Sequence, residues 1–93
     1  MDKIQKIKEY IRKQNYRITV HAQIEAAADD LNKIDIETII NTGKIVKQYT
    51  HDIRGTRYLI KGYSNDGRIA YVVCRFLEIE KLSIITVYAE ESK

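Results

Sequence analysis

The most constraining feature of the chain is residues 58–88, YLIKGYSNDGRIAYVVCRFLEIEKLSIITVY. This stretch contains three apolar, β-branched and aromatic runs, and the sequence NDGR at 65–68 separates the first two. An Asp-Gly pair between alternating runs favours a two-residue hairpin turn in which both central residues have positive φ. We therefore expect the chain to be organised around an antiparallel sheet, which the helices before it would cover.

From Gly43 onward the hydrophobic pattern has a period of two, which is typical of strands. The expected strands are 44–50, 56–63, 68–77 and 82–89. Short loops between consecutive strands favour antiparallel pairing, and polar interruptions suit the first strand to an edge. The sequence therefore predicts an α+β fold with a four- to five-stranded, mainly antiparallel sheet and N-terminal helices packed on one face.

Three helices are expected before the sheet. The first, 2–14, has isoleucines at helical spacing, and Asp2 and Gln5 have the spacing of a capping box. A short strand or extended segment at 16–20 follows it. The second helix, 21–32, is rich in alanine, and we expect its apolar stripe to be Ile24, Ala28 and Leu31.

The third helix is expected over 36–42, with Asp35 as its N-cap. Ile34 and Ile39 then have the spacing of a hydrophobic staple. Gly43 follows as the expected C′ residue.

A two-residue turn at Asp66-Gly67 sets the register of the hairpin, with Lys61 opposite Val72. Alternation then places Arg57, Leu59, Lys61 and Tyr63 on one face, and Tyr58, Ile60, Tyr71, Val73 and Arg75 on the other. Cations are costly in an apolar core, so the face of Arg57 and Lys61 should meet solvent or an anion. A one-residue slip of the register would reverse the pairing.

Composition places the chain among ordinary folded proteins. With 93 residues, 44% hydrophobic and 31% charged, we expect one domain over 1–93, and a net charge of +3 is compatible with a nucleic-acid or acidic partner.

Cys74 is the only cysteine, so a disulfide framework and a thiolate metal cluster are excluded. The histidines lack metal-ligand spacing and the glycines form no phosphate loop, so no metal or cofactor is expected. No run is long and apolar enough for a membrane span or signal core, which predicts a cytoplasmic location.

Several short motifs follow one another in an order that points to a family. They are His21-Ala22 at a helix start, GKIV at 43–46, Tyr49, RYLIKGY at 57–63, Val72-Val73 and IITVY at 84–88. Together they resemble the domain of unknown function DUF4258, over about residues 16–89.

The resemblance implies a relationship to the RelE and BrnT-like toxins of type II toxin–antitoxin systems. Those toxins are small α/β proteins that cleave messenger RNA, and an antitoxin holds them inactive. The expected scaffold is therefore ribonuclease-like, with RNA and an antitoxin protein as candidate partners. Many members carry arginines in the helix after His21, where this chain has Glu25, Ala28 and Asp29. An acidic helix repels RNA, which argues against a nuclease.

Metal-independent cleavage of this type needs an activated ribose 2′-hydroxyl, a neutralised phosphorane and a protonated leaving oxygen. The candidate catalytic residues are His21, Arg57, Lys61, Arg75 and Tyr88. Each of these residues could instead have a structural, non-catalytic role. The ring of His21 can bond to backbone near the helix start, and Tyr88 can belong to the core. Arg57 can form an ion pair with a glutamate of 78–80.

A second function comes from a different class. Seven tyrosines, one phenylalanine and no tryptophan suit a protein interface as well as base stacking. The alternative is a non-catalytic interaction module that binds a protein through the sheet edge or a tyrosine-rich face.

Overall fold

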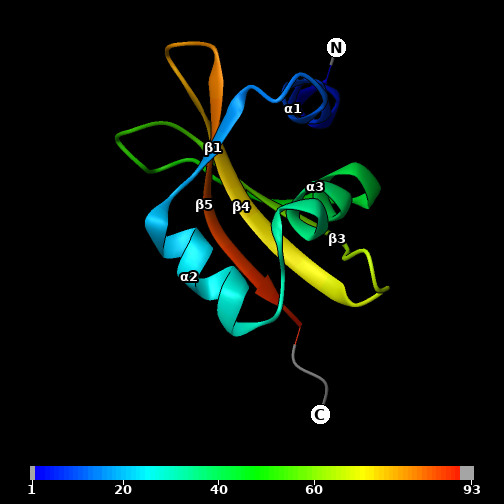
Figure 1. Cartoon of the computed structure of the whole chain (residues 1–93). Coiled ribbons are helices and arrows are strands. Elements are labelled where there is room, and N and C mark those ends of the chain that lie inside the picture. The colour runs from blue at the N-terminus through cyan, green and yellow to red at the C-terminus, as the bar shows by residue number, and fades with distance from the viewer. Residues whose placement is uncertain (1, 91–93) are drawn as a thin grey trace.

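The computed structural model describes residues 2–90, in which five strands form one sheet in the order β1-β5-β4-β3-β2 (Figure 1). The elements are α1 (Lys3–Arg12), β1 (Tyr16–Ile18), α2 (Val20–Ala28), α3 (Lys33–Thr42), β2 (Lys44–Tyr49), β3 (Arg57–Tyr63), β4 (Ile69–Leu77) and β5 (Lys81–Ala89). Strands β2 to β5 form an antiparallel meander, and β1 runs parallel to β5 at the far edge. The α+β class, the element order and the edge position of β2 are confirmed.

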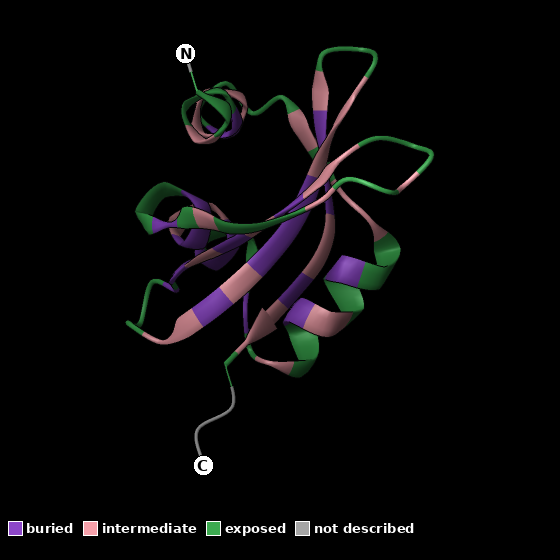
Figure 2. Ribbon diagram, turned by 180° about the vertical axis from the view of Figure 1, so that it is seen from behind, coloured by how far each residue is buried: buried purple, intermediate pink, exposed green. Residues whose placement is uncertain are grey.

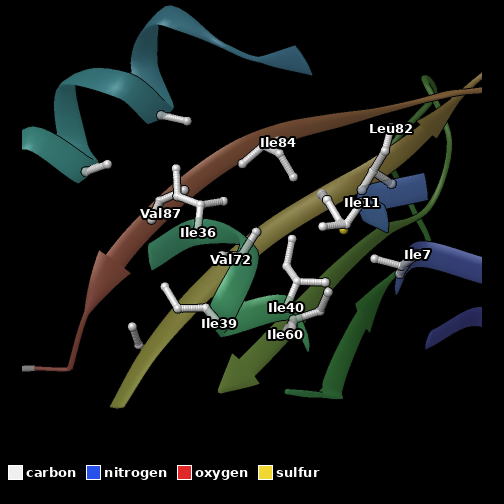
Figure 3. Close-up of a cluster of buried hydrophobic side chains, with 14 of the residues drawn as sticks. Ile7, Ile11, Ile36, Ile39, Ile40, Ile60, Val72, Leu82, Ile84 and Val87 are labelled. Atoms are coloured by element: carbon white, nitrogen blue, oxygen red, sulfur yellow. The ribbon is translucent and has the colours of Figure 1, made fainter. Parts of the chain in front are cut away.

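One face of the sheet and the three helices enclose a buried apolar cluster. Ile39 and Ile40 of α3 lie against Ile60 of β3 and Val72 of β4, and Ile84 of β5 extends the cluster (Figure 3). Buried and partly exposed bands alternate along β4, as expected of a strand with one covered face (Figure 2). Burial of each such side chain contributes roughly 1.5–3 kcal/mol, so this cluster holds the helices on one side of the sheet.

The end of α3 lies in very close contact with β3. A Cβ atom on Gly62 would be 2.0 Å from the carbonyl oxygen of Ile39, and one on Gly43 would be 2.5 Å from the same oxygen. Gly43 is the C-cap of α3 with φ −95°, so the expected left-handed C′ glycine is wrong. Positions 43 and 62 therefore require glycine because there is no room for a Cβ atom between α3 and β3.

Helix α3 begins earlier than the sequence predicts, at the N-cap Asn32. The Asn32 side chain accepts a bond from the Asp35 N–H, and the Asp35 carboxylate accepts one from the Asn32 N–H, both at 2.9 Å. Asp35 also accepts a bond from the backbone of Asn65 and so ties α3 to the β3–β4 turn. The prediction of Asp35 as the N-cap is wrong because its carboxylate completes a capping box from the third helical position. The predicted staple is also wrong, since Ile34 is exposed.

The predicted apolar stripe of α2 is wrong as well. Ile24 is 65% exposed and Ala28 is exposed, whereas Leu31 is buried beyond the end of the helix. The buried side of α2 is formed by Ala22 and Ala26. These small side chains let the helix approach the β5 edge closely, which larger apolar residues would prevent.

Helix α2 closes the part of the β5 edge that β1 leaves unpaired. Strand β1 reaches only residues 82–84 of β5. Beyond them, Glu25 accepts a bond from the Val87 N–H at 3.3 Å, and Asp29 accepts one from the Ala89 N–H at 2.9 Å. The acidic character of α2 therefore has a structural role, because it satisfies β5 edge amides that β1 does not pair.

The β3–β4 turn contains three residues rather than two. The Ser64 N–H donates to the Arg68 carbonyl at 2.8 Å, and the Gly67 N–H donates to the Ser64 carbonyl at 3.0 Å. Gly67 has φ +87°, while Asp66 is not left-handed. This is a type I turn followed by one left-handed residue, so the predicted two-residue turn is wrong.

The longer turn shifts the register by one residue. Lys61 pairs with Tyr71 instead of Val72. Tyr71, Val73 and Arg75 therefore lie on the same face as Arg57 and Lys61, which corrects the predicted opposite placement.

Candidate functional site

The face of the sheet that points away from the buried cluster is called the outer face here. Its side chains are Arg17 of β1; Lys44, Lys47 and Tyr49 of β2; Arg57, Leu59, Lys61 and Tyr63 of β3; Ile69, Tyr71, Val73 and Arg75 of β4; and Ser83, Thr86 and Tyr88 of β5. The helices pack on the opposite face, so no helix within residues 2–90 covers it.

Two arginines are neighbours at one end of the outer face. The register pairs Tyr58 with Cys74, so the next position along sets Arg57 of β3 opposite Arg75 of β4. Tyr49 of β2 pairs with Arg57 on its other side, and the guanidinium carbon lies 5.1 Å from the ring centroid. The ring thus supports one guanidinium plane, and like charges on adjacent strands make this end strongly cationic.

Asp52, in the loop between β2 and β3, brings a carboxylate to the arginine end. Its Oδ2 lies 3.3 Å from Nε of Arg57, and its side chain is only 12% exposed. The bond from the Arg54 backbone N–H, with the charges of Arg54, Arg57 and Arg75, outweighs burial and lowers the pKa of Asp52. The ion-pair partner of Arg57 is therefore this loop aspartate, and not Glu78 or Glu80, which the sequence left open as alternatives.

Two stacked tyrosines lie toward the other end of the outer face. Tyr71 pairs with Tyr88, and their ring centroids are 5.1 Å apart with planes inclined by 21°. The Lys61 ammonium lies 5.9 Å from the Tyr71 centroid. Burial, together with the charges of Tyr49 and Glu25, raises the pKa of Tyr88, so this phenol keeps its proton at neutral pH.

The two ends are joined by an apolar strip. Leu59 of β3 and Val73 of β4 pair at the centre of the outer face. Val73 is only 8% exposed although no helix of the described chain covers it. The longer side chains around it therefore shield it, and the outer face consists of rings and cations around an apolar centre.

Two hollows open beside the cations. One of about 440 Å³ is lined at the arginine end by residues including Lys47, Tyr49, Asp52 and Arg57. Another of about 360 Å³ lies at the opposite end, beside Lys61 and near the α3–β3 contact. Both are places where an anion could meet lysine or arginine.

The structure brings together four of the five residues that the sequence proposed. Arg57, Lys61, Arg75 and Tyr88 all lie on the outer face. His21 does not join them. It lies on α2, where its exposed ring has Nε2 3.2 Å from the Glu25 carboxylate.

Sequence reasoning missed Tyr71 and Tyr49 on the outer face and Asp52 in the loop beside it. Tyr71 was placed on the wrong face, because NDGR fits both a two-residue and a three-residue loop. For Tyr49, the sequence shows only the alternation of a strand, which does not mark it as a site residue. Asp52 becomes visible only through a contact between its loop and β3.

Within residues 2–90, no three histidine, cysteine, aspartate or glutamate side chains gather as a metal site requires. None of the helices in that range is both long and apolar enough to cross a bilayer.

A family model for a domain of unknown function, DUF4258, matches residues 18–89. The match covers most of the chain, from the end of β1 through α2, α3 and the whole meander. The chain belongs to the DUF4258 family. Comparison with curated proteins and with solved structures gave no match. The outer face of this DUF4258 domain lies almost entirely within the matched residues, since only Arg17 precedes them.

Proposed function

We propose that this DUF4258 protein is a toxin-like RNA-binding protein and that the outer face is its RNA contact surface. The observation that carries the proposal is the stacked pair Tyr71–Tyr88 on the same open face as the neighbours Arg57 and Arg75. Single-stranded nucleic acid binds where rings that stack on bases accompany cations that contact the backbone. Several RNA-binding domains present such rings on an uncovered sheet.

The two ends of the outer face would contact different parts of one strand. Arg57 and Lys61 are four residues apart on β3, which separates their Cα atoms by about 13 Å. Bases stack on Tyr71 and Tyr88 beside Lys61, while the backbone continues to the arginines across Leu59 and Val73. The uncharged apolar centre can pack against the faces of sugars and bases without electrostatic repulsion of the phosphates.

Binding is tested with a labelled oligouridylate of about ten nucleotides at low salt. The double variant Arg57→Ala/Arg75→Ala should bind at least tenfold more weakly. The slope of log K for binding against log salt concentration should become shallower by about one for each arginine removed. Arg12→Ala is the matched control, because Arg12 is exposed on α1 and pairs with Glu9. Absence of binding, or an equal loss in the Arg12 variant, would remove the proposal.

The same face supports metal-independent cleavage as a second step of this function, because four candidate groups share it. The ribose 2′-oxygen would bond to the adjacent phosphorus while the bond from phosphorus to the 5′-oxygen breaks, giving a 2′,3′-cyclic phosphate and a 5′-hydroxyl. Lys61 would neutralise the phosphorane, and Tyr88 at the same end of the outer face would donate its proton to the leaving oxygen, while Arg57 and Arg75 would hold the backbone further along the strand. With His21 on α2 and Asp52 engaged by arginine, the 2′-hydroxyl proton must pass to water, so we expect slow cleavage.

Cleavage has its own test in the presence of a chelator. An all-ribose oligonucleotide should be cut to cyclic-phosphate products, whereas one with 2′-deoxyribose at every position should bind and stay intact. Tyr88→Phe should reduce the cutting rate and leave binding nearly unchanged. Binding without any cutting would remove the catalytic step and leave RNA binding in place.

An antitoxin is the partner that this function implies. We propose that it inhibits by laying acidic side chains on the outer face where RNA phosphates would bind. Its inhibition should then be competitive with the oligonucleotide. If the chain binds a protein through this face and never binds RNA, the interaction-module alternative holds instead.

A further inference from the structure

We infer that Asp52 is a built-in substitute for an RNA phosphate, and that Arg54, Arg57 and Arg75 around it form a phosphodiester subsite. This inference rests on the proposed RNA-binding function and makes it more specific. The loop carboxylate would occupy the subsite in the free protein, and a backbone phosphate would displace it on binding.

The position of the Asp52 side chain is the first argument. Its loop is otherwise open to solvent, with the next residue, Ile53, 98% exposed. The carboxylate nevertheless turns inward and is 12% exposed, with Oδ1 3.6 Å from Nε of Arg54 and Oδ2 3.3 Å from Nε of Arg57. The Arg54 backbone N–H donates to Oδ1 at 2.9 Å and fixes the local turn, and attraction to the guanidinium groups favours the inward direction of the carboxylate.

The arginines are only partly satisfied by this carboxylate. The buried Nε of Arg57 makes no hydrogen bond, although Oδ2 of Asp52 is close enough for an ion pair. Within residues 2–90, no carboxylate lies at ion-pair distance from Arg75. A phosphate accepts bidentate bonds from guanidinium and would supply the oriented acceptors that Asp52 does not.

There is space through which the exchange can occur. The hollow of about 440 Å³ adjoins Asp52 and Arg57 and is also lined by Lys47 and Tyr49. Gly55 lies near the end of this loop, has φ +115° and has no heavy atom within 4 Å of a Cβ built there. The conformational freedom of this glycine allows the loop to move without a steric clash with the sheet.

Comparison of Asp52→Asn with Glu78→Gln tests the inference. Both substitutions remove one negative charge from loops, but Glu78 is an exposed residue of the β4–β5 loop. Asparagine can still accept the bond from the Arg54 N–H, so the loop should keep its turn. Asp52→Ser preserves an acceptor in the same way and provides a second variant.

Removal of a partly buried competing ion pair should strengthen binding of the oligouridylate by about fivefold. Glu78→Gln should change binding by less than about twofold, as expected of an exposed carboxylate that makes no ion pair within residues 2–90. The gain should vanish when Asp52→Asn is combined with Arg57→Ala and Arg75→Ala. Wild-type or weaker binding by folded Asp52→Asn and Asp52→Ser would overturn the inference and leave RNA binding intact.

A second readout separates this inference from the proposed function. Inorganic phosphate should shift the Nε–Hε NMR signal of Arg57, and less phosphate should be needed in Asp52→Asn. If that shift occurs while no RNA binds, the phosphate subsite stands and the RNA function fails. If the signal does not move in either protein, the subsite is overturned.

Discussion

Tyr71 and Tyr88 stack across β4 and β5 with their ring planes inclined by 21°, on the face of the sheet opposite the helices. Their position depends on the three-residue turn before β4, which pairs Tyr71 with Lys61. With a two-residue turn, Tyr71 would point into the buried cluster. One residue of turn length therefore decides whether the outer face carries the stacked Tyr71–Tyr88 pair, which we call the ring platform.

The ring platform should carry part of the RNA affinity. Tyr71→Ala is expected to weaken oligouridylate binding about tenfold, because each base–ring stack contributes about 1–3 kcal/mol. Tyr71→Phe keeps the ring and removes only the hydroxyl that donates to Glu90, so it should bind nearly as the wild type does. Fluorescence anisotropy measures both. An equal loss in the two variants would show that the ring face is not the contact.

Gly62 should be irreplaceable for steric reasons. Gly62→Ala places a Cβ 2.0 Å from the Ile39 carbonyl oxygen and should lower the free energy of unfolding by about 3 kcal/mol. Gly67→Ala meets nothing within 4 Å and should lose only about 1 kcal/mol through its left-handed backbone. Urea denaturation compares them. A smaller loss at 62 than at 67 would contradict the close α3–β3 contact.

Much of the fold could be predicted because its signals are local. The period of two from Gly43 onward, the short loops and the Asp2 cap indicate the meander and the first helix without reference to tertiary contacts. The side-chain alternation of β3 alone placed Arg57 and Lys61 on one face, as the structure has them.

The errors occur where a tertiary contact outweighs a local preference. Ile24 looks like a core residue, but α2 turns Ala22 and Ala26 inward because only small side chains allow Glu25 to reach the β5 edge. His21 looks catalytic, but its place on α2 pairs it with Glu25. No pattern in the sequence shows that Asp52 reaches Arg57, because loop direction depends on charges from other strands.

The carboxylates of α2 should protect the β5 edge. Asp29→Ala removes the acceptor of the Ala89 N–H and should lower the free energy of unfolding by about 1–2 kcal/mol. Amide exchange at Ala89 should accelerate more than exchange at Val72, which lies in the centre of the sheet. Asp30→Asn is the control, since Asp30 is exposed and asparagine tolerates its φ of +55°. Unchanged exchange at Ala89 would contradict the capping role.

Cys74 should make the protein less stable in alkaline solution. Burial raises the pKa of its thiol to about 12, whereas an unfolded cysteine has a pKa of about 8.5. Above about pH 8.5 the unfolded chain loses a proton that the folded chain keeps. The Cys74 contribution to stability is therefore complete below that pH and falls by about 1.4 kcal/mol per pH unit above it. Urea titrations at about pH 8 and about pH 10 should show a smaller decrease for Cys74→Ala than for the wild type, and equal decreases would refute this.

The central claim, that the outer face contacts RNA, is tested most directly by an amide NMR titration of the whole chain with the oligouridylate. We predict shifts at outer-face positions of β3, β4 and β5, including Lys61, Tyr71 and Arg75, and none along α1. Shifts confined to the helices, or no shifts at low salt, would contradict the claim.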